Sequence, residues 1–189
     1  MIVEHVATDS KKLITAAKKG TVYWFTGLPG AGKTSIAGQF FQELKERYLN
    51  VVYLDGDEVR RALNIESGHY ALNERLKLAK KYSGLCALLS SQEMHVVIAT
   101  VSMFHEVRDW NRKNLHSYKE IYIEISKQKL FERDQKQLYT KALNDEIKDV
   151  VGIDLPFEIP KNPDIVIKNN GETSVSQIVE NLLVRLDVS

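Results

Sequence analysis

The chain has 189 residues, of which 43% are hydrophobic, so it can bury one substantial core, and we expect residues 1–189 to form a single domain. Its 26 Lys and Arg side chains nearly balance its 25 Asp and Glu side chains, which argues against a nucleic-acid partner. No apolar run is long enough to span a membrane, and the N-terminus lacks the apolar core of a signal peptide. We therefore expect a cytoplasmic protein without a membrane partner.

Apolar, β-rich runs alternate with helical patterns along the chain. After an N-terminal lead-in over residues 1–20, with a short helix at 10–19, the expected strands are 22–26, 51–54, 96–100, 121–125 and 165–167. The expected helices are 33–47, 59–63, 73–92, 104–115, 127–133 and 174–186. This order is typical of an α/β fold in which helices cover both faces of a five-stranded parallel sheet.

A glycine-rich sequence directly follows the first expected strand and reads Gly27-Leu28-Pro29-Gly30-Ala31-Gly32-Lys33-Thr34. It has every feature of a phosphate-binding loop, whose backbone N–H groups turn inward around phosphate oxygens. Lys33 can reach the β- and γ-phosphates, and the Thr34 hydroxyl can bind Mg²⁺. Ser35 then opens a helix whose N-terminus favours the same anion. The motif predicts a P-loop NTPase fold that binds a nucleoside triphosphate through Gly27, Gly30, Ala31, Gly32, Lys33, Thr34 and Ser35.

The second expected strand leads into two acidic residues, Asp55 and Asp57. The carboxyl edge of a parallel sheet is where the phosphates lie, so both carboxylates are expected beside them. There a carboxylate can hold Mg²⁺ or accept the proton of an attacking hydroxyl. Because side chains alternate in an extended chain, we expect Asp55 and Asp57 on the same side, with Asp55 linked to the metal and Asp57 as the base. Either could be the base, and one of them could instead cap the next helix.

The long segment 134–162 has no regular pattern, is rich in charge, and contains Pro156 and Pro160. A compact domain rarely keeps such a long irregular connection unless it is functional. We therefore expect this segment to be a lid that closes over the site and contributes to the acceptor pocket.

Three stretches of this sequence resemble the adenylylsulfate kinase family. They are residues 20–34, which include the glycine-rich loop, Leu54-Asp55-Gly56-Asp57-Glu58-Val59-Arg60, and Gly152-Ile153-Asp154-Leu155-Pro156-Phe157. The likeness continues in the family's order over residues 20–167. That family transfers the γ-phosphate of ATP to the ribose 3′-hydroxyl of adenosine 5′-phosphosulfate in sulfate assimilation. The resemblance thus implies a kinase that uses ATP and Mg²⁺, acts on a small nucleotide and can form a homodimer.

Residue by residue, the resemblance implies Asp57 as the base, with Lys33 and Lys136 as further catalytic groups. Arg supplies a planar fork of donors that suits phosphate or sulfate. Arg133 would bind ATP, and with Lys136 it could neutralise charge on the transferring phosphoryl group when the lid closes. Each of these cations could instead be a solvated surface charge. The implied acceptor-binding residues are Asp57, Arg60, Asn64, Tyr70, Arg75, Val101, Ser102, Lys136 and Val150.

The sequence departs from the family mostly on the acceptor side. Two Phe residues of the family sandwich the acceptor adenine, whereas this chain has His69-Tyr70 and Val150 at those places. Leu78 replaces a family Asn, and the family's Ser-Pro-Tyr-Arg reads Ser102-Met103-Phe104-His105. By analogy with base–aromatic stacking, losing one face of the sandwich costs about 1–3 kcal/mol.

Two acceptors are compatible with these departures. The first expectation is adenosine 5′-phosphosulfate, held by Tyr70 after drift at the other positions. The alternative is cytidine 5′-diphosphoramidate, whose 3′-hydroxyl a relative with this type of sequence phosphorylates in capsular polysaccharide modification. A smaller pyrimidine stacked on one aromatic ring would suit a pocket bounded by Tyr70, Leu78, Val101 and Val150.

A third possibility from a different class is a nucleotide-binding switch without kinase activity. Such switches use a base-recognition motif of the Asn-Lys-x-Asp type, which Asn162-Pro163-Asp164 does not supply. The basic residues of the acceptor and lid segments would also have no role in a switch.

Overall fold

The computed structural model describes residues 20–65, 72–134 and 137–188. The expected lead-in helix at 10–19 and the expected site residues Tyr70 and Lys136 lie outside these ranges.

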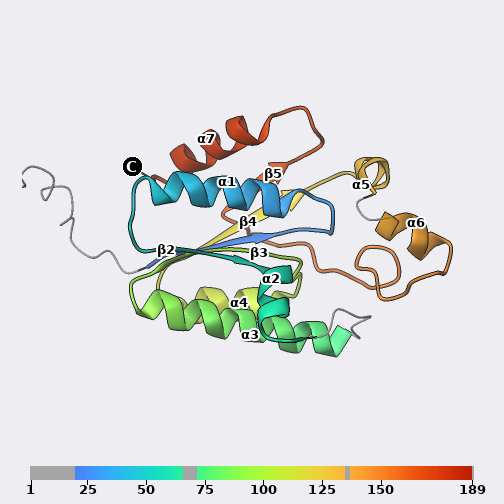
Figure 1. Ribbon diagram of the computed structural model, residues 1–189, viewed down its shortest axis with the longest axis horizontal. Coiled ribbons are helices and arrows are strands. Elements are labelled where there is room, and N and C mark those ends of the chain that lie inside the picture. The colour runs from blue at the N-terminus through green and yellow to red at the C-terminus, as the bar shows by residue number, and fades with distance from the viewer. Residues whose placement is uncertain (1–19, 66–71, 135–136, 189) are drawn as a thin grey trace, which may run out of the picture.

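The described chain forms a five-stranded parallel sheet in the order β2-β3-β1-β4-β5. The strands are β1 Val22–Thr26, β2 Val51–Asp55, β3 His95–Thr100, β4 Tyr118–Glu124 and β5 Ile165–Lys168. Helices α1 (Lys33–Lys45) and α7 (Val175–Arg185) cover one face, and α3 (Leu72–Ser91) and α4 (His105–Asn114) cover the other (Figure 1). The expected α/β fold with a parallel sheet is therefore confirmed.

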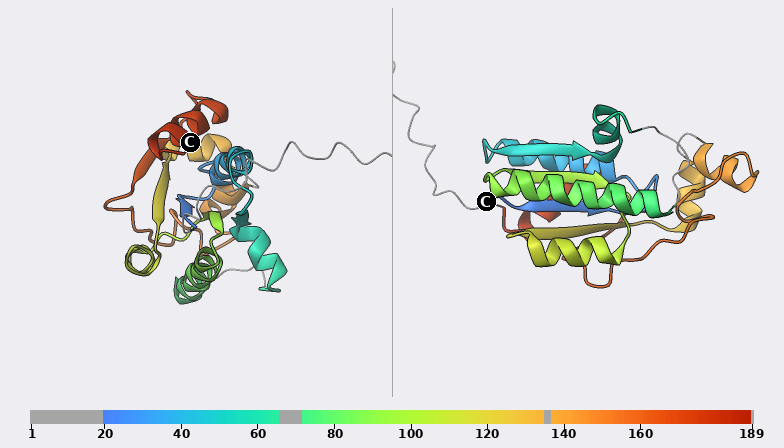
Figure 2. Two further views of the ribbon diagram at one scale, coloured as in Figure 1. Left: turned by 90° about the vertical axis from the view of Figure 1, so that its left-hand side faces the viewer. Right: turned by 90° about the horizontal axis from the view of Figure 1, so that it is seen from below.

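Three further helices lie toward the carboxyl ends of the strands, at one end of the molecule (Figures 1 and 2). They are α2 (Gly56–Ala62), α5 (Lys127–Arg133) and α6 (Leu138–Leu143). The chain thus gathers its connecting loops, the glycine-rich loop included, at the edge where parallel α/β sheets bind ligands.

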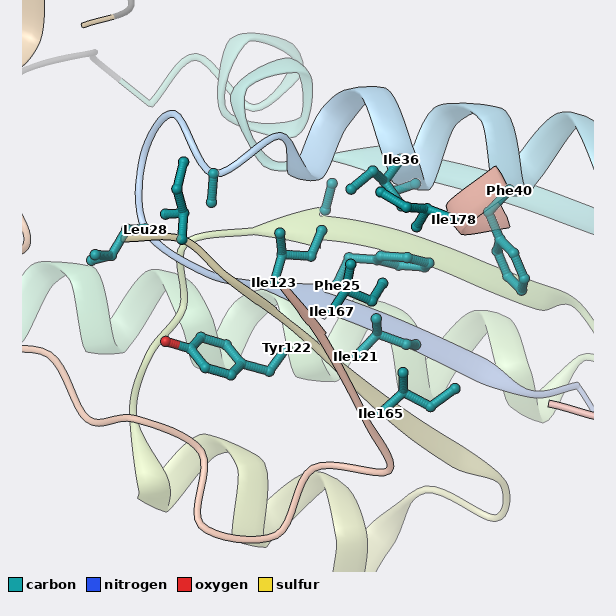
Figure 3. Close-up of a cluster of buried hydrophobic side chains, with 14 of the residues drawn as sticks. Phe25, Leu28, Ile36, Phe40, Ile121, Tyr122, Ile123, Ile165, Ile167 and Ile178 are labelled. Atoms are coloured by element: carbon teal, nitrogen blue, oxygen red, sulfur yellow. The ribbon is translucent and has the colours of Figure 1, made fainter. Parts of the chain in front are cut away.

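The central strand β1 is buried along its whole length, which explains its uninterrupted apolar sequence. On one face, Ile36, Phe40 and Leu44 of α1 recur at helical spacing and are fully buried against the sheet. Figure 3 shows Ile36 and Phe40 directed toward Phe25 of β1, and the Phe25 and Phe40 rings lie 5.4 Å apart. This packing anchors α1, and with it the loop that precedes α1.

Two expectations about segments were wrong. The second helix begins at Gly56 and not at 59, because the Asp55 side chain accepts a hydrogen bond from the Asp57 N–H and caps the helix three residues earlier. The segment 134–162 is not irregular throughout, since α6 lies within it. Asp134 starts this short helix by accepting hydrogen bonds from the N–H groups of Tyr139 and Thr140. A helix of six residues, fewer than two turns, within a charge-rich segment has too little apolar periodicity to be predicted.

Candidate active site

The glycine-rich loop joins β1 to α1 and depends on glycine for its backbone path. Gly30 has φ 77° and Gly32 has φ 95°, values in the left-handed region that side chains disfavour. Gly32 is the N-cap of α1, so the loop ends at the positive end of a thirteen-residue helix. The loop therefore combines a backbone path that needs glycine with the dipole of a helix N-terminus, as phosphate-binding loops do.

Lys33 folds back over this loop, where its Nζ donates a hydrogen bond to the Leu28 carbonyl at 2.8 Å. Only 8% of the residue is exposed. Burial lowers the pKa of its ammonium to about 8, and Asp57 and Asp55 partly oppose this shift by attracting the charge. A bound phosphate would supply the opposite charge that this buried ammonium lacks.

Asp55 lies at the end of β2 and links the loop helix to α2. Its Oδ2 accepts a hydrogen bond from the Thr34 hydroxyl at 2.9 Å, and its Oδ1 accepts one from the Asp57 N–H at 2.9 Å. The expectation that Asp55 and Asp57 extend from one strand was wrong, because Asp57 is already in α2. The Asp57 side chain is 63% exposed and contacts the Arg60 guanidinium. The two carboxylates thus differ: Asp55 is buried among protein donors and Asp57 is open to a substrate.

A cavity of about 340 Å³ lies over the loop. Its walls combine the residues expected to bind ATP with those expected to bind the acceptor: Gly30, Lys33, Thr34, Asp55, Asp57, Arg60, Arg75 and Val101. Arg75 donates a hydrogen bond to the Asp149 carbonyl at 2.7 Å, which ties α3 to the segment after α6. One cavity is thus lined both by the phosphate-binding loop and by the guanidinium groups of Arg60 and Arg75, so it can hold a phosphoryl donor and a charged acceptor together.

A second, smaller pocket adjoins this cavity and shares Arg60, Arg75 and Val101 with it. Its other walls come from α3, from the residues after β3 and from the segment 151–156. They include Leu78, Tyr82, Ser102, Met103, Phe104, Val151 and Pro156. Most of this wall is apolar, which suits a nucleotide base beside the charged cavity.

Several expected site residues lie elsewhere. Val150 is buried in the main core, and its neighbour Val151 lines the smaller pocket instead. Asn64 is exposed just beyond the end of α2 and lines neither pocket in the described part of the chain. Arg133 lines neither pocket but contacts the loop itself, where it donates hydrogen bonds to the Gly30 carbonyl at 3.4 Å and the Asn169 carbonyl at 3.0 Å. Ser35 is exposed in the first turn of α1.

Two tyrosines line the pockets although neither was expected at the site from the sequence. Tyr82 lines the smaller pocket, and its hydroxyl donates to the Gly56 carbonyl at 2.8 Å. Its spacing of four and seven residues from Leu78 and Arg75 places all three on one helix face, a signal that the sequence contained. Tyr139 of α6 lines the larger cavity. No comparable signal marked it, because α6 itself was not predicted.

Among residues 20–65, 72–134 and 137–188, no group of three or more His, Cys, Asp or Glu side chains could hold a metal ion by itself. Thr34 and Asp55 nevertheless fit a nucleotide-bound Mg²⁺, which takes one or two protein ligands and completes its shell with phosphates and water. Their hydroxyl and carboxylate oxygens are the donors that this cation prefers.

Comparison with known proteins identifies the family. The adenylylsulphate kinase family model matches residues 19–168. The chain belongs to the adenylylsulphate kinase family. It is accordingly a P-loop kinase, an ATP-dependent phosphotransferase, and the alternative of a switch without kinase activity is dropped.

Its relatives within the family differ in the acceptors that they are named for. A cytidine diphosphoramidate kinase of Campylobacter jejuni is 45% identical over 167 residues, which cover 87% of this chain and 95% of the relative. An adenylyl-sulfate kinase of Clostridium kluyveri is 35% identical over 167 residues, covering 88% and 83%.

A solved structure shares the whole architecture. The adenylylsulfate kinase of Mycobacterium tuberculosis, in complex with AMPPNP and adenosine 5′-phosphosulfate, matches with a TM-score of 0.81 and 31% identity. The match covers 89% of this chain and 98% of that one.

Within the described ranges, none of the helices is both long and apolar enough to cross a membrane.

Proposed function

We propose that the protein transfers the γ-phosphate of ATP to the ribose 3′-hydroxyl of cytidine 5′-diphosphoramidate. The observation that carries this choice is the greater identity to the Campylobacter jejuni kinase, 45% against 35% for the Clostridium kluyveri kinase. The acceptor pocket is consistent with it, since Leu78, Val101 and Val151 give it aliphatic walls. Aliphatic walls cannot stack on a base as aromatic rings do, and a pyrimidine, which has the smaller ring, loses less stacking energy in such a pocket than a purine does.

The residues of the larger cavity would divide the reaction between them. Lys33 and the loop N–H groups would bind the β- and γ-phosphates, and Arg60 and Arg75 would hold the charged groups of the acceptor. Asp57 would accept the proton of the 3′-hydroxyl, for which its exposure beside the loop is suited. Arg133 and Lys136 would neutralise charge on the transferring group.

Magnesium is part of this proposal. Thr34 and Asp55 would hold Mg²⁺, which would neutralise the negative charge of the β- and γ-phosphate oxygens. Asp55 already accepts the Thr34 hydroxyl hydrogen bond, so both oxygen donors lie on the same side of the loop.

The second candidate acceptor is adenosine 5′-phosphosulfate. It is favoured by the family itself and by the likeness to the Mycobacterium tuberculosis kinase in complex with that nucleotide. This acceptor was the first expectation from the sequence, and relatives named for each of the two acceptors share the family of this chain.

A substrate panel separates the two candidates. With saturating MgATP, we expect kcat/KM for cytidine 5′-diphosphoramidate to exceed that for adenosine 5′-phosphosulfate at least about ten-fold, a difference of about 1.4 kcal/mol in transition-state binding. Lys33→Ala is the control that should remove transfer to both. The reverse preference would establish the second candidate and reject the first.

The remaining expectations stay predictions: that residues 1–189 act as one domain, that the protein is cytoplasmic, and that it forms a homodimer.

A further inference from the structure

The carbonyl groups of the phosphate-binding loop are held by side chains. The Leu28, Pro29, Gly30 and Ala31 carbonyls follow one another in the chain, and each accepts a side-chain hydrogen bond. Lys33 of the loop itself supplies the first. The other three donors come from the distant carboxyl-terminal half: Arg133 of α5, Tyr139 of α6 and Asn169 after β5.

Of the three contacts that come from outside the loop, two are short and come from buried residues. The Tyr139 hydroxyl donates to the Pro29 carbonyl at 2.7 Å, and Asn169 Nδ2 donates to the Ala31 carbonyl at 2.8 Å. Tyr139 is 2% exposed and Asn169 is 8% exposed. Both are themselves fixed: the Tyr139 N–H donates to the Asp134 carboxylate at 2.8 Å, and the Asn169 N–H donates to the Glu124 carbonyl at 2.8 Å.

These two contacts determine the direction of two N–H groups. In a trans peptide the C=O and the following N–H point in opposite directions. A Pro29 carbonyl held by the Tyr139 hydroxyl therefore turns the Gly30 N–H to the side away from that hydroxyl. The Ala31 carbonyl, held by Asn169, does the same for the Gly32 N–H. Both glycines have left-handed φ, so their peptide planes have little steric restraint of their own.

We infer that Tyr139 and Asn169 are positioning residues, which preset the Gly30 and Gly32 N–H groups toward the phosphates of the donor nucleotide. Because Tyr139 belongs to α6, the shape of the loop also depends on the placement of the segment expected to form the lid. The burial of Tyr139, together with the nearby Asp134 charge, raises the pKa of its hydroxyl, which therefore remains a donor at neutral pH. The inference concerns the donor side and does not depend on which acceptor is used.

Removing one hydroxyl tests it. Tyr139→Phe should raise the Kd for MgADP about three- to ten-fold and lower kcat/KM for ATP by a similar factor, as expected for one buried hydrogen bond. The KM for the acceptor should match that of the control Tyr118→Phe, and the melting temperature of the nucleotide-free protein should lie within a few degrees of that control, as the loss of one hydrogen bond allows. That control removes a buried hydroxyl at the opposite end of β4. Asn169→Leu, which keeps the branched shape of the side chain but loses the donor, should repeat the effect on MgADP.

Two results would overturn the inference. One is a Kd for MgADP in Tyr139→Phe within two-fold of the control. The other is a fall in the melting temperature of the nucleotide-free variant with an equal rise of both KM values, which would mark a purely structural contact. MgADP binding requires no acceptor, so a failure here is distinct from a wrong assignment of the acceptor.

Discussion

At the scale of single residues, the two carboxylates after β2 have different chemistry although they are two positions apart. Asp55 uses one oxygen to cap α2 and the other to accept the Thr34 hydroxyl hydrogen bond, so it is buried and already engaged. Asp57 lines the cavity, and its exposed carboxylate forms an ion pair with Arg60, three residues further along α2. This contrast supports Asp57 as the base and Asp55 as the metal-linked residue.

Asp57→Asn should lower kcat by about 10²–10⁴-fold while the affinity for ATP is largely kept, because the amide cannot take the hydroxyl proton. Single-turnover kinetics and nucleotide titration measure the two quantities separately. Glu58→Gln is the matched control, since Glu58 is the next residue of α2 and pairs with Arg61 on the exposed side. An equal loss of ATP affinity in Asp57→Asn would assign this residue to the metal or to the fold instead.

Lys33 should make nucleotide binding depend on pH in a defined direction. Its pKa of about 8 without nucleotide lies below the ordinary 10.5, and bound phosphates should raise it again. Binding of MgADP should then take up a proton near pH 8.5 but not near pH 6.5, so affinity falls as the pH rises above about 8. Calorimetry in buffers of different ionisation enthalpy measures this uptake. Equal proton uptake by Lys33→Met at pH 8.5 would show that another group is responsible.

The lowered pKa of Lys33 also makes the free energy of unfolding depend on pH. Between about pH 8 and 10.5 the unfolded chain keeps the Lys33 proton that the folded protein has lost. Unfolding therefore binds a proton there, and the nucleotide-free protein gains stability from this group as the pH rises through that interval.

At the scale of elements, buried charges join α4 to β4. Arg108 and Glu120 are each 3% exposed and lie 3.2 Å apart, and Arg112 reaches the other Glu120 oxygen at 2.7 Å. Arg108 also donates to the Glu158 carbonyl at 2.8 Å. The cluster thereby holds Glu158 against α4 and β4. Glu158 lies two residues after Pro156, which lines the acceptor pocket.

Glu120→Gln should destabilise the protein by about 3–5 kcal/mol, because two guanidinium groups lose their shared carboxylate and one of them is buried. Urea unfolding measures the change. Glu106→Gln breaks the exposed pair with Lys80 and should cost at most about 1 kcal/mol. Similar losses for the two variants would show that the buried cluster contributes little.

Sequence patterns predicted the elements unevenly. The strands and long helices follow from apolar runs and helical spacing, and all five expected strands lie within a few residues of their expected bounds. The capping of α2 by Asp55 confirms one of the alternatives that the sequence left open, although the helix begins earlier than expected. The existence of α6 was not predicted, since it depends on the Asp134 side chain accepting backbone N–H groups. The turn after Val150 also depends on a carboxylate that accepts a backbone N–H, because the Val150 N–H donates to the Asp154 side chain. The next residue, Val151, lines the smaller pocket.

At the scale of the whole molecule, the donor half of the site was predictable and the acceptor half only in part. Arg60, Arg75, Leu78, Val101 and Ser102 line the pockets, whereas Val150 lies in the core. The glycine-rich loop and the acidic strand end are contiguous motifs whose geometry is set locally. The acceptor pocket is assembled from α3, the residues after β3 and the segment 151–156, and these meet only through the tertiary fold. Its aliphatic walls result from residues that no single motif contains.

The central claim, transfer of phosphate from ATP to a ribose 3′-hydroxyl, is tested most directly by identifying the product. The protein would be incubated with MgATP and cytidine 5′-diphosphoramidate, and the nucleotide product examined by phosphorus and proton NMR. We predict one equivalent of ADP and a new phosphomonoester coupled to the proton on the ribose 3′ carbon. A phosphate on another position, or ADP formed without any phosphorylated nucleotide from this acceptor or from adenosine 5′-phosphosulfate, would contradict the account.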